Sequence, residues 1–268
     1  VRYIYHENFK NHATPNVALM YKPGKFNFRA SYAAGFRTPT LSELYATDIA
    51  KKNDRLTIGN LDLKPEKNNY FSLSAEYVHE RFSVSVNAFY NNIRDMIDYN
   101  TIATGDKAME QYGHKEVRQR DNIAEAKVHG INVSANAYLG AGFNLSGGYT
   151  HLNTQDVELE QPIDKSIKNA YNINAQWAHS WKIYRLNINL NGRINSKRFS
   201  KSYGYAPEYQ LWDLNTRHSF NLKSVIIEPG FGMENLFDYM DDRPYNSNYA
   251  TLTPGRSFYI SLSLKFKS

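Results

Sequence analysis

The sequence predicts an all-β protein whose antiparallel strands cross a membrane as an up-and-down barrel. Stretches of about ten residues alternate apolar and polar side chains, which gives each strand one apolar and one polar face. The connections between these stretches are short and long in turn. No stretch approaches the roughly 18 consecutive apolar residues of a membrane helix, so crossing by helices is excluded.

The composition fits this fold without requiring it. The chain has 268 residues, with 21 Tyr, 14 Phe and no Cys. A barrel with a polar lumen face has a low mean hydropathy, here −0.62, but a soluble β-protein fits the same value. The net charge of +6 comes from Lys and Arg scattered among acids, without the basic run that nucleic-acid binding uses, so no nucleic-acid partner is expected.

The alternation identifies about twelve strands in order along the chain. In the last one, Phe258, Ile260 and Leu262 share a face, and the other face carries three serines with Tyr259 and Lys265. Another places Leu186, Ile188 and Leu190 opposite a row of asparagines. The expected strands are Val1–Tyr5, Asn16–Tyr21, Phe26–Phe36, Phe71–His79, Phe82–Ala88, Ile131–Ala137, Phe143–His151, Tyr171–His179, Leu186–Ile194, Trp212–Leu222, Val225–Met233 and Phe258–Phe266.

The connections at one end of the expected barrel are short, and those at the other end are long. The short ones lie at Lys22–Gly24, near His79 and Glu80, and at Gly140–Gly142, Ser180–Tyr184 and Lys223–Ser224. The long ones run through Arg37–Asn68, Arg94–Asn122, Asn153–Lys168, Ser196–Glu208 and Phe237–Pro254. Short periplasmic turns and long extracellular loops alternate in this way, whereas a soluble sandwich has no reason to keep its long loops at one end.

Aromatic residues cluster where the expected strands would meet the two membrane surfaces. Interfacial girdles of a barrel account for such clusters. The residues expected there are Tyr21, Tyr32, Phe36, Tyr77, Phe89, Tyr90, Tyr149, Trp177, Trp181, Trp212 and Phe266.

Four motifs, in order, resemble those of the TonB-dependent receptors. They are GFRTPTLSELY at Gly35–Tyr45, GNLDLKPE at Gly59–Glu66, ENLFDY at Glu234–Tyr239 and PGRSF at Pro254–Phe258. Thr38 departs from the usual Ala and Leu61 from the usual Pro, and Lys267 and Ser268 follow the usual terminal aromatic. Haem receptors of this family commonly carry a His between the first two motifs, but Thr40–Ile58 has none, which disfavours haem.

The resemblance implies a 22-stranded barrel closed by an N-terminal plug, so residues 1–268 would be the C-terminal half of the barrel, without the plug and the early strands. It implies active uptake across the outer membrane of a Gram-negative bacterium, driven through TonB, which would act on the N-terminal region outside this chain. The implied ligand is a small metal chelate: a ferric siderophore, haem or cobalamin. The surrounding partners would be outer-membrane lipid and lipopolysaccharide, with a surface lipoprotein as a further candidate.

No catalytic constellation is present in the sequence. The eight His residues are dispersed, and neither HExxH nor GxSxG occurs. We expect no enzyme, no cofactor and no metal site. Asp238, Asp241 and Asp242 could offer oxygen ligands to a cation, but a solvated acidic loop is the favoured interpretation.

The expected ligand-binding residues lie in two of the long connections. The segment Asp106–Asp121 gathers Lys107, Tyr112, His114, Lys115, Arg118 and Arg120. Cations beside an aromatic ring suit a planar anionic chelate, although lipopolysaccharide phosphates would select the same residues and a plain solvated loop is favoured over both. Arg37 is expected at the top of a strand, where it would position a loop or touch the ligand.

Three other functions remain open. A passive, porin-like barrel of about twelve strands is the main alternative to the receptor. An outer-membrane hydrolase would need a nucleophile or paired acids at the rim, and a soluble β-sandwich adhesin would be soluble without detergent.

Overall fold

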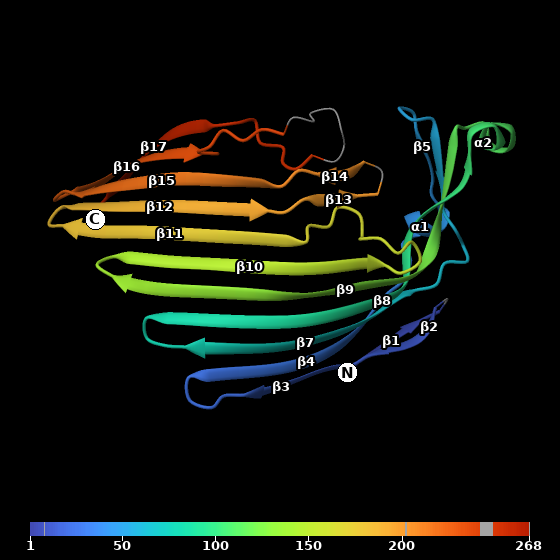
Figure 1. Cartoon of the computed structure of the whole chain (residues 1–268), viewed down its shortest axis with the longest axis horizontal. Helices are drawn as coiled ribbons and strands as arrows, with labels where there is room; N and C mark the ends of the chain where they lie inside the picture. The colour runs from blue at the N-terminus through green and yellow to red at the C-terminus, as the bar shows by residue number, and fades with distance from the viewer. Residues whose placement is uncertain (8, 202, 242–248, 268) are drawn as a thin grey trace.

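The computed structural model of the chain describes residues 1–7, 9–201, 203–241 and 249–267 (Figure 1). Most of the chain is strand, and the described residues include two short helices. No helix among them has the length and apolarity to cross a membrane. The elements are β1 (Arg2–His6), β2 (Lys10–Thr14), β3 (Asn16–Tyr21), β4 (Phe26–Arg37), α1 (Leu41–Tyr45), β5 (Thr47–Ala50), β6 (Arg55–Ile58), β7 (Glu66–Val78), β8 (Phe82–Thr104), α2 (Gly105–Tyr112), β9 (Glu116–Gly140), β10 (Phe143–Asp156), β11 (Asn169–Trp181), β12 (Tyr184–Asn195), β13 (Arg198–Ser200), β14 (Gly204–Ala206), β15 (Tyr209–Asn221), β16 (Val225–Glu234) and β17 (Ser257–Phe266).

A curved wall of antiparallel strands forms most of the molecule (Figure 1). Its order is β17-β16-β15-β12-β11-β10-β9-β8-β7-β4-β3, so neighbours in the wall are consecutive along the chain apart from short insertions. This is the predicted up-and-down arrangement, and the predicted strands from Asn16 onward all lie in the wall. The wall is not closed, because β3 and β17 end the path.

The first expected strand is a strand, but it is not part of the wall. β1 pairs only with β2, in a separate two-stranded sheet. Pro15 separates β2 from β3, and pairing with β4 begins only at Asn16, opposite Ala33. The wall of this chain therefore has eleven strands in its path rather than the expected twelve.

The two faces of the wall differ in polarity as the alternation predicts. One face has a polar hollow of about 430 Å³, lined in part by Asn187 and Asn189. The other has an apolar groove of about 560 Å³, lined in part by Ile188 and Leu190. In a membrane barrel the apolar face meets lipid and the polar face lines the lumen.

Aromatic rings form one band near the short turns and another near the opposite rim. Near the turns, the ring centroids of Tyr77 and Phe82 lie 5.6 Å apart; near the other rim, those of Tyr149 and Tyr171 lie 4.7 Å apart. Phe89 was wrongly expected in a girdle. Successive strand residues face opposite sides, so Phe89 points to the polar face, where its ring stacks on Tyr70 at 6.2 Å.

The expected loop over residues 94–122 is instead a folded extension of the wall. β8 and β9 run past the rim as a hairpin that ends in α2. Asp95 has a left-handed φ of 56° where this hairpin leaves the wall, and β8 pairs with β9 in the same register on both sides of it. β6 then pairs with the outer part of β9 in parallel, and β5 pairs with β6. We call β5, β6, α2 and the outer parts of β8 and β9 the arm, which stands apart from the wall in Figure 1.

Candidate ligand-binding surface

The arm has a small core of its own. Val117 and Ala108 are fully buried, Leu56 is nearly so, and Ile58, Ala103 and Tyr112 pack around them. Leu56 lies opposite Val117 in the parallel pair of β6 and β9. This contact joins the connection between β4 and β7 to the hairpin of β8 and β9 in one folded unit.

This core separates the residues that the sequence grouped together. Tyr112, the last residue of α2, packs against the core on the side to which Val117 points. Arg118 and Arg120 alternate with Val117 along β9, so their side chains leave the opposite face of the sheet. The cation–aromatic contact present here is instead Arg120 over Tyr99, with its guanidinium carbon 3.6 Å from the ring centroid.

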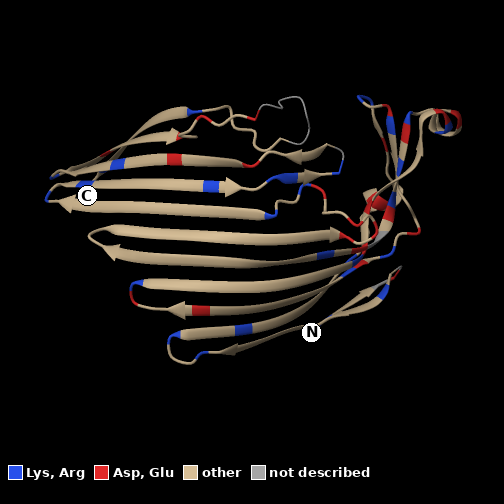
Figure 2. Cartoon of the chain, in the orientation of Figure 1, with Lys and Arg blue, Asp and Glu red and all other residues tan. Residues whose placement is uncertain are grey.

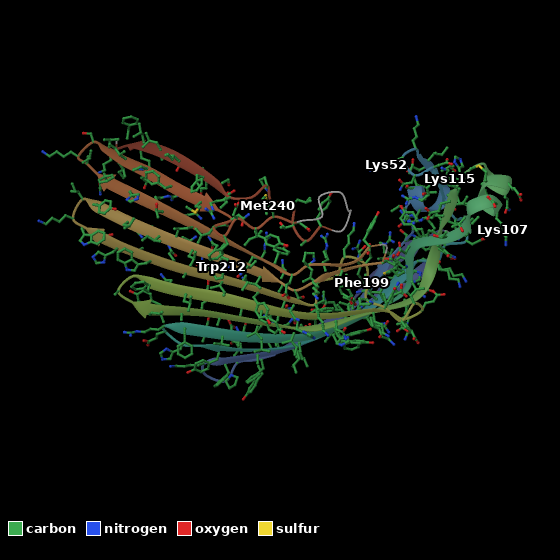
Figure 3. The ribbon with its side chains drawn as sticks, turned by 45° about the horizontal axis from the view of Figure 1, so that its top comes forward. Lys52, Lys107, Lys115, Phe199, Trp212 and Met240 are labelled. Atoms are coloured by element: carbon green, nitrogen blue, oxygen red, sulfur yellow. The ribbon has the colours of Figure 1, made fainter. Side chains whose placement is uncertain are left out.

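Two of the other expected residues, His114 and Arg118, have side-chain partners within the arm. His114 Nδ1 lies 2.9 Å from Asp54 Oδ1, and this hydrogen bond holds the pKa of the Asp54 carboxyl below its usual range. Arg118 Nε lies 2.6 Å from Glu116 Oε1. The side chain of Lys115 is exposed. The arm also carries several acids, so lysines and arginines are interspersed with acids along it in Figure 2. Figure 3 shows Lys52, Lys107 and Lys115 on the arm, away from the wall.

Arg37 joins three segments at the base of the arm. Its Nε donates to Glu66 Oε2 at 2.7 Å, and its Nη1 donates to Glu43 Oε2 at 2.9 Å. Glu66 Oε1 also accepts the backbone N–H of Ile97 at 2.8 Å. Arg37 therefore positions the loop, one of its two expected roles, whereas its contact with a ligand stays a prediction.

Glu43 also caps the helix that follows. Thr40 and Glu43 form a capping box at the start of α1, in which each side chain accepts the other's backbone N–H. Partial burial raises the pKa of Glu43, but hydrogen bonds from Arg37 and Thr40 outweigh it, and the pKa lies below the usual value. Sequence reasoning missed Glu43 and Glu66 as partners of Arg37, although both lie in the two motifs that carried the resemblance.

Asn122 is a second missed residue at this base. Its side-chain amide donates to the backbone oxygens of Asp95 and Lys64, at 2.6 and 2.9 Å, and its carbonyl accepts the N–H of Lys64 at 2.7 Å. These bonds tie the loop before β7 to the point where the hairpin bends. Asn122 was placed at the end of an expected loop, and its sequence context gives no signal of this role.

The acidic residues near the end of the chain serve the backbone. Asp238 Oδ1 accepts the N–H of Arg256 at 2.7 Å, and Asp241 Oδ2 accepts the N–H of Ala250. Asp242 lies outside the described residues. Among the residues that the structure describes, no three His, Asp or Glu side chains gather in a way that could hold a metal ion.

A family model described as "TonB dependent receptor-like, beta-barrel" matches residues 1–236. The chain belongs to this family. TonB-dependent receptor barrels lie in the outer membrane, so the short turns of this chain face the periplasm and the arm faces the outside.

Solved structures of receptors share this fold. A variant of the ferric enterobactin receptor PfeA of Pseudomonas aeruginosa is 19% identical, with a TM-score of 0.74 over 99% of this chain and 41% of that one. The copper transporter OprC is 13% identical, with a TM-score of 0.71 over 93% of this chain and 38% of that one. BauA, the ferric preacinetobactin receptor of Acinetobacter baumannii, is 18% identical, with a TM-score of 0.66 over 96% and 36%. The TonB-dependent receptor chain described here thus spans about two fifths of their length.

Proposed function

We propose that this chain is the C-terminal half of the barrel of a receptor that takes up a ferric siderophore by TonB-driven transport. Family membership supports uptake, and two of the three similar structures are described as receptors for ferric siderophores. The similarity to a copper transporter leaves another metal as the second candidate. Haem and cobalamin fit the same family but have no such support among these three structures.

The folded arm is the observation that carries this proposal. A passive pore works best with an open entrance, whereas a receptor must bind a dilute ligand before transport. A surface that is already ordered loses less conformational entropy when the ligand binds. The buried contact of Leu56 with Val117, together with the Arg37 network at the base, provides such order.

The expected ligand contacts on this arm are Lys115, Arg118, Arg120 and His114. A ferric siderophore complex of the catecholate type is anionic and has flat aromatic groups, which suits a guanidinium already stacked on Tyr99. Arg118 shares its charge with Glu116, so its contribution is smaller than that of a free cation. Exposed charges are individually weak, and several must act together.

The partners follow from the same proposal. TonB would act on an N-terminal plug, which is not part of the wall described here. Lipopolysaccharide would surround the outer rim, and its phosphates compete for the cations of the arm. A surface lipoprotein would bind the exposed loops if it takes part at all.

Ligand affinity tests the proposal directly. The purified full-length receptor is titrated with a ferric tris-catecholate, a ferric hydroxamate, a copper chelate, haem and cyanocobalamin, at low and high salt. We expect a ferric siderophore to bind most tightly and its affinity to fall as salt rises. Tighter binding of the copper chelate, haem or cyanocobalamin would refute the proposed substrate class.

Matched variants locate the contacts. Replacing Lys115, Arg118 and Arg120 together by Gln removes three charges, and we expect about a tenfold loss of affinity at low salt, since exposed charge contacts contribute roughly 0.2–1 kcal/mol each. The control exchanges Lys115→Arg, Arg118→Lys and Arg120→Lys, which keeps the charge but loses the flat guanidinium on Tyr99. Unchanged affinity in the Gln variant would place the site in the lumen or the plug.

A further inference from the structure

The periplasmic rim of the wall is strongly basic. Of the described residues in the short turns, Glu80 alone is acidic. The exposed cations of these turns and of the adjoining C-terminal end are Lys22, Lys25, Arg81, Lys182, Lys223 and Lys267. Figure 2 shows lysines and arginines at the turn ends of the strands, in contrast to the mixed charges of the arm.

On the lipid-facing side of the wall, a series of neighbouring rings lies between these cations and the middle of the membrane. Trp177 and Trp181 have centroids 6.0 Å apart, with the His179 imidazole 4.4 Å from Trp181. Trp181 stacks on Tyr184 at 5.6 Å, across the turn that contains Lys182. Tyr184 in turn lies 5.0 Å from Phe220 on the next strand. Such rings prefer the level where lipid headgroups meet the hydrocarbon.

An apolar groove adjoins this series on the same face. Its lining includes Phe143, Leu145, Trp177 and Ile188, and the small Ala175 leaves room between them. Trp177 belongs both to the groove and to the ring series. Moving along β11 toward the periplasm, the surface changes from groove to rings to the cation Lys182, within a few residues.

We propose that this part of the rim binds an anionic phospholipid of the inner leaflet, such as phosphatidylglycerol. Along β11 toward the periplasm, the apolar groove, the aromatic rings and Lys182 follow one another in the same order as the hydrocarbon chain, the glycerol ester and the phosphate of such a lipid. An acyl chain lies in the groove, the rings contact the ester level, and Lys182 attracts the phosphate. Lys223 and Arg81, on other turns of the same rim, attract the phosphates of neighbouring lipids. The net positive charge of the rim repels a second copy of the same surface and favours an anionic occupant.

The lipid retained by the purified receptor tests this inference. The full-length receptor is extracted from outer membranes and placed in nanodiscs of phosphatidylethanolamine, with or without phosphatidylglycerol. Bound lipid is counted by native mass spectrometry, and Tm is measured in both. We expect preferential retention of phosphatidylglycerol and a higher Tm in its presence. Equal retention of both lipids, or retention of lipopolysaccharide instead, would overturn the proposal.

Two variants and a control separate the parts of the site. Arg81→Gln, Lys182→Gln and Lys223→Gln together should lower phosphatidylglycerol retention at least about tenfold, because each cation near an anionic surface contributes appreciably. Lys51→Gln, Lys52→Gln and Lys64→Gln remove equal charge from the extracellular side and should leave phosphatidylglycerol retention unchanged. Equal retention by the two triple variants refutes the role of the rim. Ala175→Leu fills the groove and should also lower retention; retention at the wild-type level would exclude the groove as the acyl site.

Discussion

Arg37 organises more of this receptor than its exposed position implies. Its side chain is 42% exposed, yet it bonds Glu43, within the connection between β4 and β7, and Glu66, at the start of β7. Glu66 also accepts a hydrogen bond from the backbone N–H of Ile97, which belongs to β8. One side chain therefore sets the relative positions of the wall, α1 and the base of the arm.

Removal of this side chain should loosen the base of the arm without unfolding the barrel. Arg37→Gln loses the bidentate pairing with Glu66 and leaves two carboxylates close together. Because the site is partly exposed, we expect a local cost of about 1 kcal/mol. Trypsin should cut residues 51–64 several times faster in the variant, measured on full-length receptor in membranes. Arg37→Lys should restore only part of the protection, since an ammonium cannot bond in the same bidentate way.

Acidification should release α1 from the same network. Glu43 has a pKa below its ordinary value of 4.5, so its bonds stabilise the loop at neutral pH, and this stabilisation is lost as pH falls below 4.5 through the lowered value. A spin label at Leu41 should become more mobile over that range. In Glu43→Gln the label should be mobile already at neutral pH and insensitive to acid. A label equally immobile at all pH values would exclude this role.

The sequence predicted which kinds of residue the candidate site contains, but not which of them contact one another. Glu116, Arg118 and Arg120 alternate, so a strand would have placed them on one face and shown that Arg118 has an acid beside it. The sequence analysis predicts a loop for this segment, and a loop does not alternate its side chains between two faces, so the pairing of Arg118 with Glu116 is not predicted. The separation of Tyr112 from both arginines needs the position of α2, which depends on burial of Val117 against distant Leu56 and could not be read from local sequence.

At the scale of elements, the strands that cross the membrane could be predicted from the sequence, and their continuations outside it could not. Wall strands such as β12 and β17 meet lipid on one face and water on the other, so their sequences alternate. Beyond the rim no lipid face imposes this pattern, and residues 96–104 lose the alternation although they continue β8. The extension of β8 and β9 into the arm was therefore missed for a physical reason.

A polar residue in the core of the arm should unfold the arm alone. Val117 is fully buried, and Val117→Asn leaves an amide without partners at a cost of roughly 1–3 kcal/mol. We expect rapid proteolysis within residues 96–121 while the barrel keeps its heat-modifiable migration on gels. Ile102→Asn changes an exposed residue of the neighbouring strand β8, also within the arm, and should have little effect. Loss of the barrel band in Val117→Asn would show that arm and wall fold as one unit.

Neighbouring residues of β12 should respond oppositely to a new charge. Ile188→Arg places a cation on the lipid face and should cost roughly 2–4 kcal/mol near mid-membrane. Asn189→Arg faces the polar hollow and should cost much less. Urea titration of the full-length receptor refolded into vesicles measures both. A larger cost for Asn189→Arg would reverse the assigned faces.

At the scale of the whole molecule, the wall has two unpaired edges. β3 and β17 end the path, and each presents unbonded backbone groups along its outer side. Such edges are costly in a membrane, where no water satisfies them. The resemblance anticipated that further strands are needed, whereas composition and periodicity alone also allowed a complete small barrel.

These edges predict that the chain alone will not form a stable barrel. We propose that residues 1–268 are the C-terminal part of a larger wall. Exported to the outer membrane by itself, the chain should be degraded or remain without heat-modifiable migration, while the full-length receptor shows it. A stable, heat-modifiable species formed by this chain alone would favour the porin-like alternative.

The parallel pairing of β6 with β9 also has a kinetic consequence. Residues 55–58 cannot reach residues 116–119 until β7, β8 and β9 are arranged, because two complete crossings of the wall separate them in the chain. Closing a connection of this length costs entropy that local hairpins avoid. The arm therefore folds after the hairpins of the wall and opens before they do. During biogenesis we therefore expect an interval in which an inserted barrel displays an unfinished outer surface that proteases can cut.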